Sequence, residues 1–73
     1  MMAPEFVYRD CRVSITFEIA EQHRYRGVAI IIFGESGAKM AHEVRTEGAY
    51  DDWNEASRRV EQLARQWIDG KRG

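Results

Sequence analysis

The sequence predicts an α+β fold in which a three- to four-stranded antiparallel β-meander is followed by one long C-terminal amphipathic helix packed on one sheet face. Apolar and polar residues alternate in two segments within the first two thirds of the chain, and a helical repeat occupies the last third. A chain of 73 residues has room for one core. We expect residues 1–73 to form a single domain, with a leader at 1–5, a sheet at about 6–46 and a helix at about 52–69.

Alternating apolar residues predict the strands. Between Val13 and Ile19, every second residue is apolar, which is typical of a half-buried strand. The short run 6–8 precedes it as an edge strand that turns at Arg9-Asp10. Residues 25–33 are rich in β-branched side chains, and 38–46 alternate again, so we expect strands over both ranges.

The two connecting loops predict the strand pairing. The loop at 20–24 is expected to pair Ile19 with Tyr25, and the turn at Gly34-Glu35-Ser36-Gly37 is expected to pair Phe33 with Ala38. One face of the sheet then collects apolar side chains and is the predicted core: Phe6, Val13, Ile15, Phe17, Ile19, Tyr25, Ala29, Ile31, Phe33, Met40 and Val44. Small residues at Gly27 and Ala29 leave a shallow depression on this face, into which we expect Trp53 or Trp67 to insert.

The C-terminal helix is predicted by its apolar stripe and its end signals. Its apolar residues fall on one face at helical spacing: Trp53, Ala56, Val60, Leu63, Ala64, Trp67 and Ile68. Asp51-Asp52 is expected to cap the first turn, with Glu55 completing a capping box. Gly70 is expected to end the helix as a C′ glycine.

The second sheet face carries the main functional hypothesis. Val28, Ile30 and Ile32 form an apolar stripe there with a polar and charged rim, and the sequence predicts no second helix to cover it. Such a stripe can be an ordinary half-exposed surface. It can also seat a protein partner, in the first place a second copy of the chain. The predicted function is a small non-catalytic protein-interaction module or homodimer.

A nucleic-acid-associated regulatory role is the alternative. Arg12, Arg24, Arg26 and Arg45 fall on or beside the open face, where arginines can contact a phosphate backbone. The net charge of −1 counts against a dedicated nucleic-acid binder, which is usually strongly basic. Glu18 is also expected opposite Arg26, where it would neutralise part of the patch.

No motif predicts an enzyme, a cofactor or a metal site. His23, His42 and Cys11 lack the spacing of metal ligands, and no nucleophile stands beside a base. No glycine-rich segment joins a strand to a helix in the way a phosphate cradle requires.

The composition predicts a cytoplasmic protein. Cys11 is the single cysteine, so an internal disulfide is excluded. The N-terminus has no charged start followed by an apolar stretch, and the apolar run at 28–33 is too short to span a bilayer. We therefore expect no signal peptide and no membrane partner.

Two resemblances accompany these patterns. Three strands before a helix, with Tyr25-Arg26-Gly27-Val28 entering a strand, look superficially like plant-type AP2 DNA-binding domains and the integrase arm-binding fold. The aromatic-rich basic strands of that family are absent, so no DNA-contact residue is transferred. The chain, with its helix ending in residues 64–69, also resembles short uncharacterised proteobacterial proteins of ββ(β)βα build. That resemblance implies a bacterial protein and adds no mechanism.

Overall fold

The fold is a four-stranded antiparallel sheet followed by one helix, which confirms the predicted α+β class. The computed structural model describes residues 5–34 and 37–72. The strands follow one another across the sheet in the order β1-β2-β3-β4. The elements in chain order are β1 (Glu5–Tyr8), β2 (Cys11–Ala20), a short 3₁₀ turn η1 (Glu21–His23), β3 (Arg24–Phe33), β4 (Met40–Arg45) and α1 (Trp53–Arg72).

The predicted leader at 1–5 is partly corrected, because Glu5 already belongs to β1. It pairs with Ser14, and the Ser14 hydroxyl donates a hydrogen bond to Glu5 Oε2 at 3.0 Å. Residues 1–4 of that leader lie outside the described part of the chain. The predicted edge strand at 6–8 and its turn at Arg9-Asp10 are confirmed, and Arg9 and Asp10 both adopt a positive φ.

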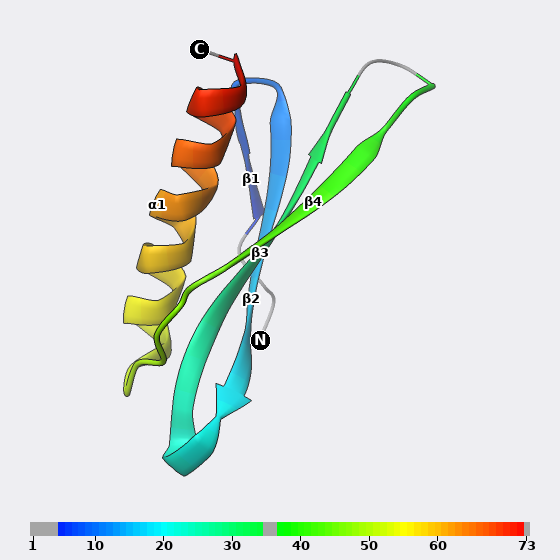
Figure 1. The fold of residues 1–73 in the computed structure, drawn as a ribbon. Helices are drawn as coiled ribbons and strands as arrows, with labels where there is room; N and C mark the ends of the chain where they lie inside the picture. The colour runs from blue at the N-terminus through cyan, green and yellow to red at the C-terminus, as the bar shows by residue number, and fades with distance from the viewer. Residues whose placement is uncertain (1–4, 35–36, 73) are drawn as a thin grey trace.

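Helix α1 lies along one face of the sheet, while both long hairpins extend beyond it (Figure 1). The β2–β3 hairpin reaches past the start of α1, and the end of β3 and the start of β4 lie away from the helix. Ile19 and Met40 sit in these extensions and are 71% and 61% exposed. The alternating pattern predicts both in the core. They belong to the helix-facing side of the sheet, but α1 does not cover them.

The sheet confirms one predicted register and corrects the other. Ile19 pairs with Tyr25, as the loop at 20–24 predicted. Phe33 pairs with Met40 rather than with Ala38, so β4 is displaced by two residues and begins at Met40. The turn is longer than predicted and includes positive φ angles at Gly34 and Gly37; Glu35 and Ser36 lie outside the described residues. Because side chains alternate with a period of two, a two-residue shift leaves every side chain on its predicted face.

The core lies between β2, β3 and α1. Its fully buried side chains come from these three elements: Cys11, Val13, Ile15, Ala29, Ile31, Val60, Ala64 and Ile68. Helix α1, rather than a tryptophan side chain, fills the depression at Gly27. A Cβ at Gly27 would overlap the Ala56 carbonyl oxygen and lie 2.8 Å from Val60 Cβ. The expectation that a tryptophan inserts there is therefore wrong.

The two tryptophans instead pack beside the core at opposite ends of α1. Trp53 lies 6.2 Å from Phe17, measured between ring centroids. Trp67 lies 5.3 Å from Phe33 and stacks on His42 at 4.1 Å with an interplanar angle of 9°. These contacts fix both ends of the helix against the sheet.

The predicted Asp52 cap at the start of α1 is confirmed. The Glu55 carboxylate contacts Arg59 rather than completing the predicted capping box, and the end of the helix is corrected. The Asn54 N–H donates to Asp52 Oδ1 at 3.0 Å, so Asp52 caps the first turn. The helix continues through Gly70 to Arg72, and the predicted stop at Gly70 is wrong. The ammonium group of Lys71 lies 4.7 Å above the Phe33 ring, a cation–π contact that holds this last turn on the sheet.

Asp69 ties the end of α1 to the β1–β2 turn. Arg9 Nη1 donates to Asp69 Oδ1 at 2.8 Å, and the Tyr8 hydroxyl donates to the same oxygen at 2.9 Å. The hydrogen bonds from Arg9 and then from Tyr8 hold the pKa of the Asp69 carboxyl below its ordinary value.

Candidate protein-interaction edge

The outer edge of β4 is the longer of the two sheet edges. In the described part of the chain, β4 pairs with β3 on one side and with no strand on the other. The opposite edge belongs to β1, which has four residues against six in β4. An edge strand presents backbone N–H and C=O groups that can pair with another chain.

One hydrogen bond shows which residues of β4 face outward. The Thr46 N–H donates to the Gly27 carbonyl oxygen at 3.0 Å, so Thr46 directs its backbone toward β3. In an antiparallel ladder this direction alternates from residue to residue. The backbone groups of Ala41, Glu43 and Arg45 therefore point away from β3, toward the free edge.

Thr46 also fixes the bend that follows β4. It is buried, with 3% of its surface exposed. Its hydroxyl accepts the Gly27 N–H at 3.0 Å and donates to the Gly48 carbonyl at 2.9 Å. The chain then returns to β3, where Tyr25 and Tyr50 exchange two backbone hydrogen bonds of 2.7 and 2.8 Å.

A groove of about 900 Å³ runs between this edge and α1. Its lining comes from β4, the following bend and one side of α1: His42, Glu43, Val44, Arg45, Thr46, Glu47, Gly48, Tyr50, Arg59, Gln62, Leu63, Gln66 and Trp67. The half-buried Val44, Leu63 and Trp67 contribute its apolar surface. The groove can therefore accept apolar side chains from a segment lying along β4.

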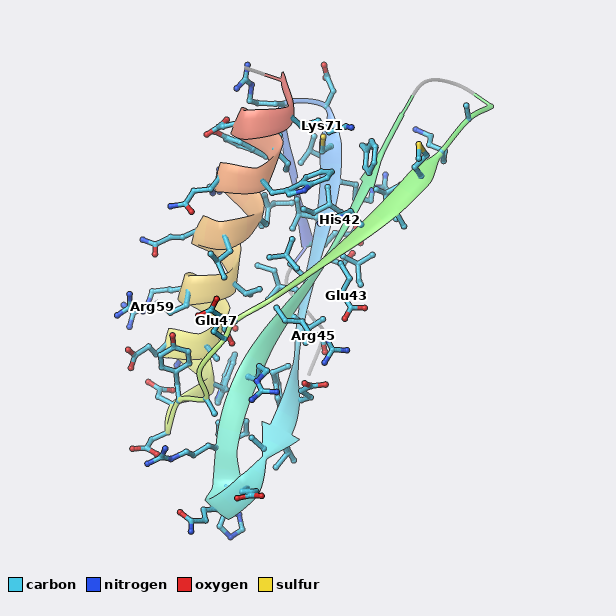
Figure 2. The ribbon with its side chains drawn as sticks, in the orientation of Figure 1. His42, Glu43, Arg45, Glu47, Arg59 and Lys71 are labelled. Carbon is cyan, nitrogen blue, oxygen red and sulfur yellow. The ribbon has the colours of Figure 1, made fainter. Side chains whose placement is uncertain are left out.

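The polar end of the groove lies near the start of α1. Figure 2 shows Glu47 beside α1, which carries Arg59. Both lie on the opposite side of β4 from Glu43 and Arg45. The Arg59 guanidinium lies 5.9 Å from the centroid of the Tyr50 ring and 3.7 Å from the Glu55 carboxylate. These contacts hold the Arg59 guanidinium, ion-paired with Glu55, at this end of the groove.

A network of charges covers the other side of β4, on the open face. Arg45 Nη1 lies 2.8 Å from Glu18 Oε1, and Arg45 Nε donates to Glu43. Arg26 adds a longer contact of 3.8 Å to the same Glu18 oxygen. The hydrogen bond that Arg45 donates to Glu43, followed by the charge of Glu18, raises the pKa of Arg45. The edge of β4 thus carries alternating acidic and basic side chains on this face.

The predicted apolar stripe lies on the open face, as expected from the register, but its three members differ in exposure. Val28 is only 7% exposed, whereas Ile30 and Ile32 are half-buried. Val28 pairs with Arg45 across the β3–β4 ladder. The accessible apolar surface of the stripe therefore comes from Ile30 and Ile32.

The four candidate nucleic-acid arginines do not form one free cluster. Arg24 lies at the far end of β3 and pairs with Asp51 at 3.3 Å. Arg26 and Arg45 share Glu18, and the Nε of Arg26 is buried. Arg12 is exposed near the other end of the sheet, where it pairs with Ile32.

The described residues offer few features of a chemical site. His23 is exposed in the 3₁₀ turn, and His42 stacks on Trp67. Within residues 5–34 and 37–72, no group of three or more His, Cys, Asp or Glu side chains could hold a metal ion. Over the same residues, no helix has both the length and the apolar character needed to cross a membrane.

Comparison with known proteins gave no family: no protein-family description, no curated protein and no solved structure matches this chain. The two resemblances drawn from the sequence stay predictions. What the chain does is therefore argued from its own residues.

Proposed function

We propose that the chain is a small non-catalytic protein-interaction module that binds an extended polypeptide segment along the free edge of β4. The observation that carries the proposal is the row of outward backbone groups at Ala41, Glu43 and Arg45, which runs beside the groove under α1. Adding a strand to a sheet edge is a common way to recognise a peptide, because backbone hydrogen bonds give affinity and side-chain pockets give specificity.

The two sides of the edge indicate what such a segment should contain. Successive side chains of an added strand alternate between the α1 side and the open face. On the α1 side they meet Val44, Leu63 and Trp67, which favour apolar residues. On the open face they meet Glu43 and Arg45, which favour residues of opposite charge. The preferred ligand is thus an extended segment in which apolar and charged residues alternate.

The test is selection of binders from a library of displayed linear peptides, followed by measurement of their affinity for edge variants. Glu43→Pro removes an N–H that points outward, and it leaves the hydrogen bonds between β4 and β3 in place. Glu43→Thr is the matched control, since it removes the same carboxylate but keeps the N–H. Selected peptides should bind the wild type and Glu43→Thr, and binding to Glu43→Pro should fall at least tenfold.

Two results would reject the proposed surface. One is a selection that yields no binder. The other is a set of peptides that bind Glu43→Pro as tightly as Glu43→Thr and are displaced only by changes at Ile30 or Ile32, because these residues lie on the open face. That second result would favour the apolar stripe as the contact surface.

The nucleic-acid-associated role stays the alternative prediction. Its most accessible candidate is Arg12, because the other three arginines have acidic neighbours. Salt-dependent binding of labelled DNA or RNA that is lost in Arg12→Glu and Arg26→Glu would favour this alternative over protein binding.

A further inference from the structure

An antiparallel strand added to β4 is restricted by the direction of its own backbone groups. The outward groups of β4 belong to Ala41, Glu43 and Arg45. If the added strand is β4 of a second copy, its outward groups come from the same three residues. A two-fold axis must therefore pass through a residue of β4, because an axis between two residues would set outward groups against inward ones.

Charge excludes three of the six residues of β4 that could lie on such an axis. An axis through Glu43 places Glu43 opposite Glu43 of the second copy, and an axis through Arg45 places Arg45 opposite Arg45 of the second copy. Centring on His42 sets Arg45 against Lys39. Like charges directly opposite each other destabilise a strand pair.

Two registers bring opposite charges together. Centring on Ala41 sets Glu43 against Lys39, and centring on Val44 sets Glu43 against Arg45. Two-fold symmetry makes either pair twice, once on each side of the axis, and the second register uses two residues that both belong to β4. The Val44 register also closes Glu43 and Arg45 of both copies into a ring of alternating charge, because the two residues already contact each other within one strand.

The groove decides between these two registers. Its lining follows the chain from His42 to Gly48, and therefore lies along the half of β4 nearest to α1. Pairing about Val44 uses this half. Pairing about Ala41 uses the start of β4, which lies away from the helix (Figure 1). Only the Val44 register covers the groove.

We infer that the segment docked on this edge is β4 of a second copy, paired antiparallel about a two-fold axis through Val44. The inference rests on the proposed function and names its partner. The resulting dimer has one continuous eight-stranded sheet, twice the four strands of one copy. Both α1 helices lie on the same face, and the two Val44 side chains meet beside the groove.

The test is a cysteine scan of β4 under mild oxidation. In the Val44 register, the two Val44 residues form a non-hydrogen-bonded pair with Cα atoms about 4.5 Å apart, which lies within the disulfide range of about 4.4–6.8 Å. Val44→Cys should therefore give a covalent dimer of twice the 8.5 kDa chain mass. Ala41→Cys, His42→Cys and Glu43→Cys should give no covalent dimer. The wild type controls for Cys11, which is 2% exposed.

A charge change supplies a second, independent measurement. Glu43→Arg would set a second positive charge against Arg45 of the other copy, so self-association measured by sedimentation should weaken at least tenfold. Glu21→Arg makes the same change of charge in the exposed turn η1, outside β4 and the groove, and should alter association less than threefold. Circular dichroism checks that both variants keep the fold of the wild type.

Each contrary outcome has a distinct meaning. A wild-type mass of 8.5 kDa at every concentration up to the solubility limit would overturn the second copy as occupant, and the peptide selection would then decide the proposed function separately. A covalent dimer formed by Ala41→Cys, His42→Cys or Glu43→Cys instead of Val44→Cys would overturn the register. A dimer lost in Ile30→Lys but unchanged in Glu43→Arg would assign the interface to the open face.

Discussion

Gly27→Ala should destabilise the protein strongly, because the backbone of α1 lies directly over this glycine. The added methyl group would overlap the Ala56 carbonyl oxygen and lie 2.8 Å from Val60 Cβ. Neither neighbour is the flexible end of a long side chain, so the whole helix has to shift away from β3. The φ angle of Gly27 is not in the left-handed region, and alanine therefore fits the strand backbone itself.

The expected loss is about 3 kcal/mol, at the upper end of the range of about 1–3 kcal/mol for overpacked cores. For a small domain this corresponds to a fall of about 12–24 °C in Tm, at about 4–8 °C per kcal/mol. A chain of 73 residues has a total stability of about 4–10 kcal/mol, so the change removes a large part of it.

Urea unfolding followed by tryptophan fluorescence measures this loss, and Gly48→Ala is the matched control. A Cβ at Gly48 would meet only Tyr50 Oη, at 3.9 Å, and should change the free energy of unfolding by less than about 0.5 kcal/mol. Equal stabilities of the two alanine variants would refute the close approach of α1 to β3 at Gly27.

Three further changes test the contacts that hold α1 and the β4 bend. Gly70→Ala should raise the free energy of unfolding by about 0.5 kcal/mol, because Gly70 is helical; a loss would favour a helix end there. The pKa of Asp69 lies below its ordinary value of 3.8. The stability that this carboxylate contributes is therefore complete above pH 3.8 and is lost as the pH falls through the lowered pKa. Asp69→Asn should therefore reduce the difference between urea midpoints at pH 6 and pH 3, and an unchanged difference would contradict the assigned partners. Thr46→Val removes the hydroxyl that accepts the buried Gly27 N–H, and it should lower the free energy of unfolding, measured by thermal unfolding, by about 1–3 kcal/mol. The control Thr16→Val, at an exposed position, should cost little. Equal losses in the two variants would refute the role of the Thr46 hydroxyl in holding the bend after β4.

The register of the β2–β3 hairpin was predictable because two features of the sequence, the alternation in β2 and the length of the loop, restrict it independently. The alternation from Val13 to Ile19 fixes which side chains face α1, and the polar loop at 20–24 fixes the pairing of Ile19 with Tyr25. A shift of one residue would place every apolar side chain of β2 on the other face. Local pattern and turn length therefore lead to the same register.

The β3–β4 pairing and the end of α1 depend on contacts that no local pattern shows. A shift of two residues keeps each side chain on its face, so the alternation cannot separate Phe33–Ala38 from the observed Phe33–Met40 pair. Gly70 is a typical helix stop, but the contact of Lys71 with the Phe33 ring holds the helix beyond it. Both outcomes are decided by residues distant in the chain.

The groove was missed for a related reason. The meander order already implies that its last strand is an edge, which is a signal the sequence offers for β4. The lining from α1, including Leu63 and Trp67, depends on where the helix crosses the sheet. The helical stripe alone assigned both residues to the core, although both remain half-buried at the groove.

Amide hydrogen exchange along β4, measured by NMR in dilute and concentrated samples, tests the central claim most directly. The amides of Ala41, Glu43 and Arg45 point to the free edge, while those of His42 and Val44 point to β3. We expect the first three to exchange fast in dilute samples and to slow at least tenfold on concentration as the second copy docks. Exchange of Glu43 and Arg45 that stays fast at every concentration would contradict the account.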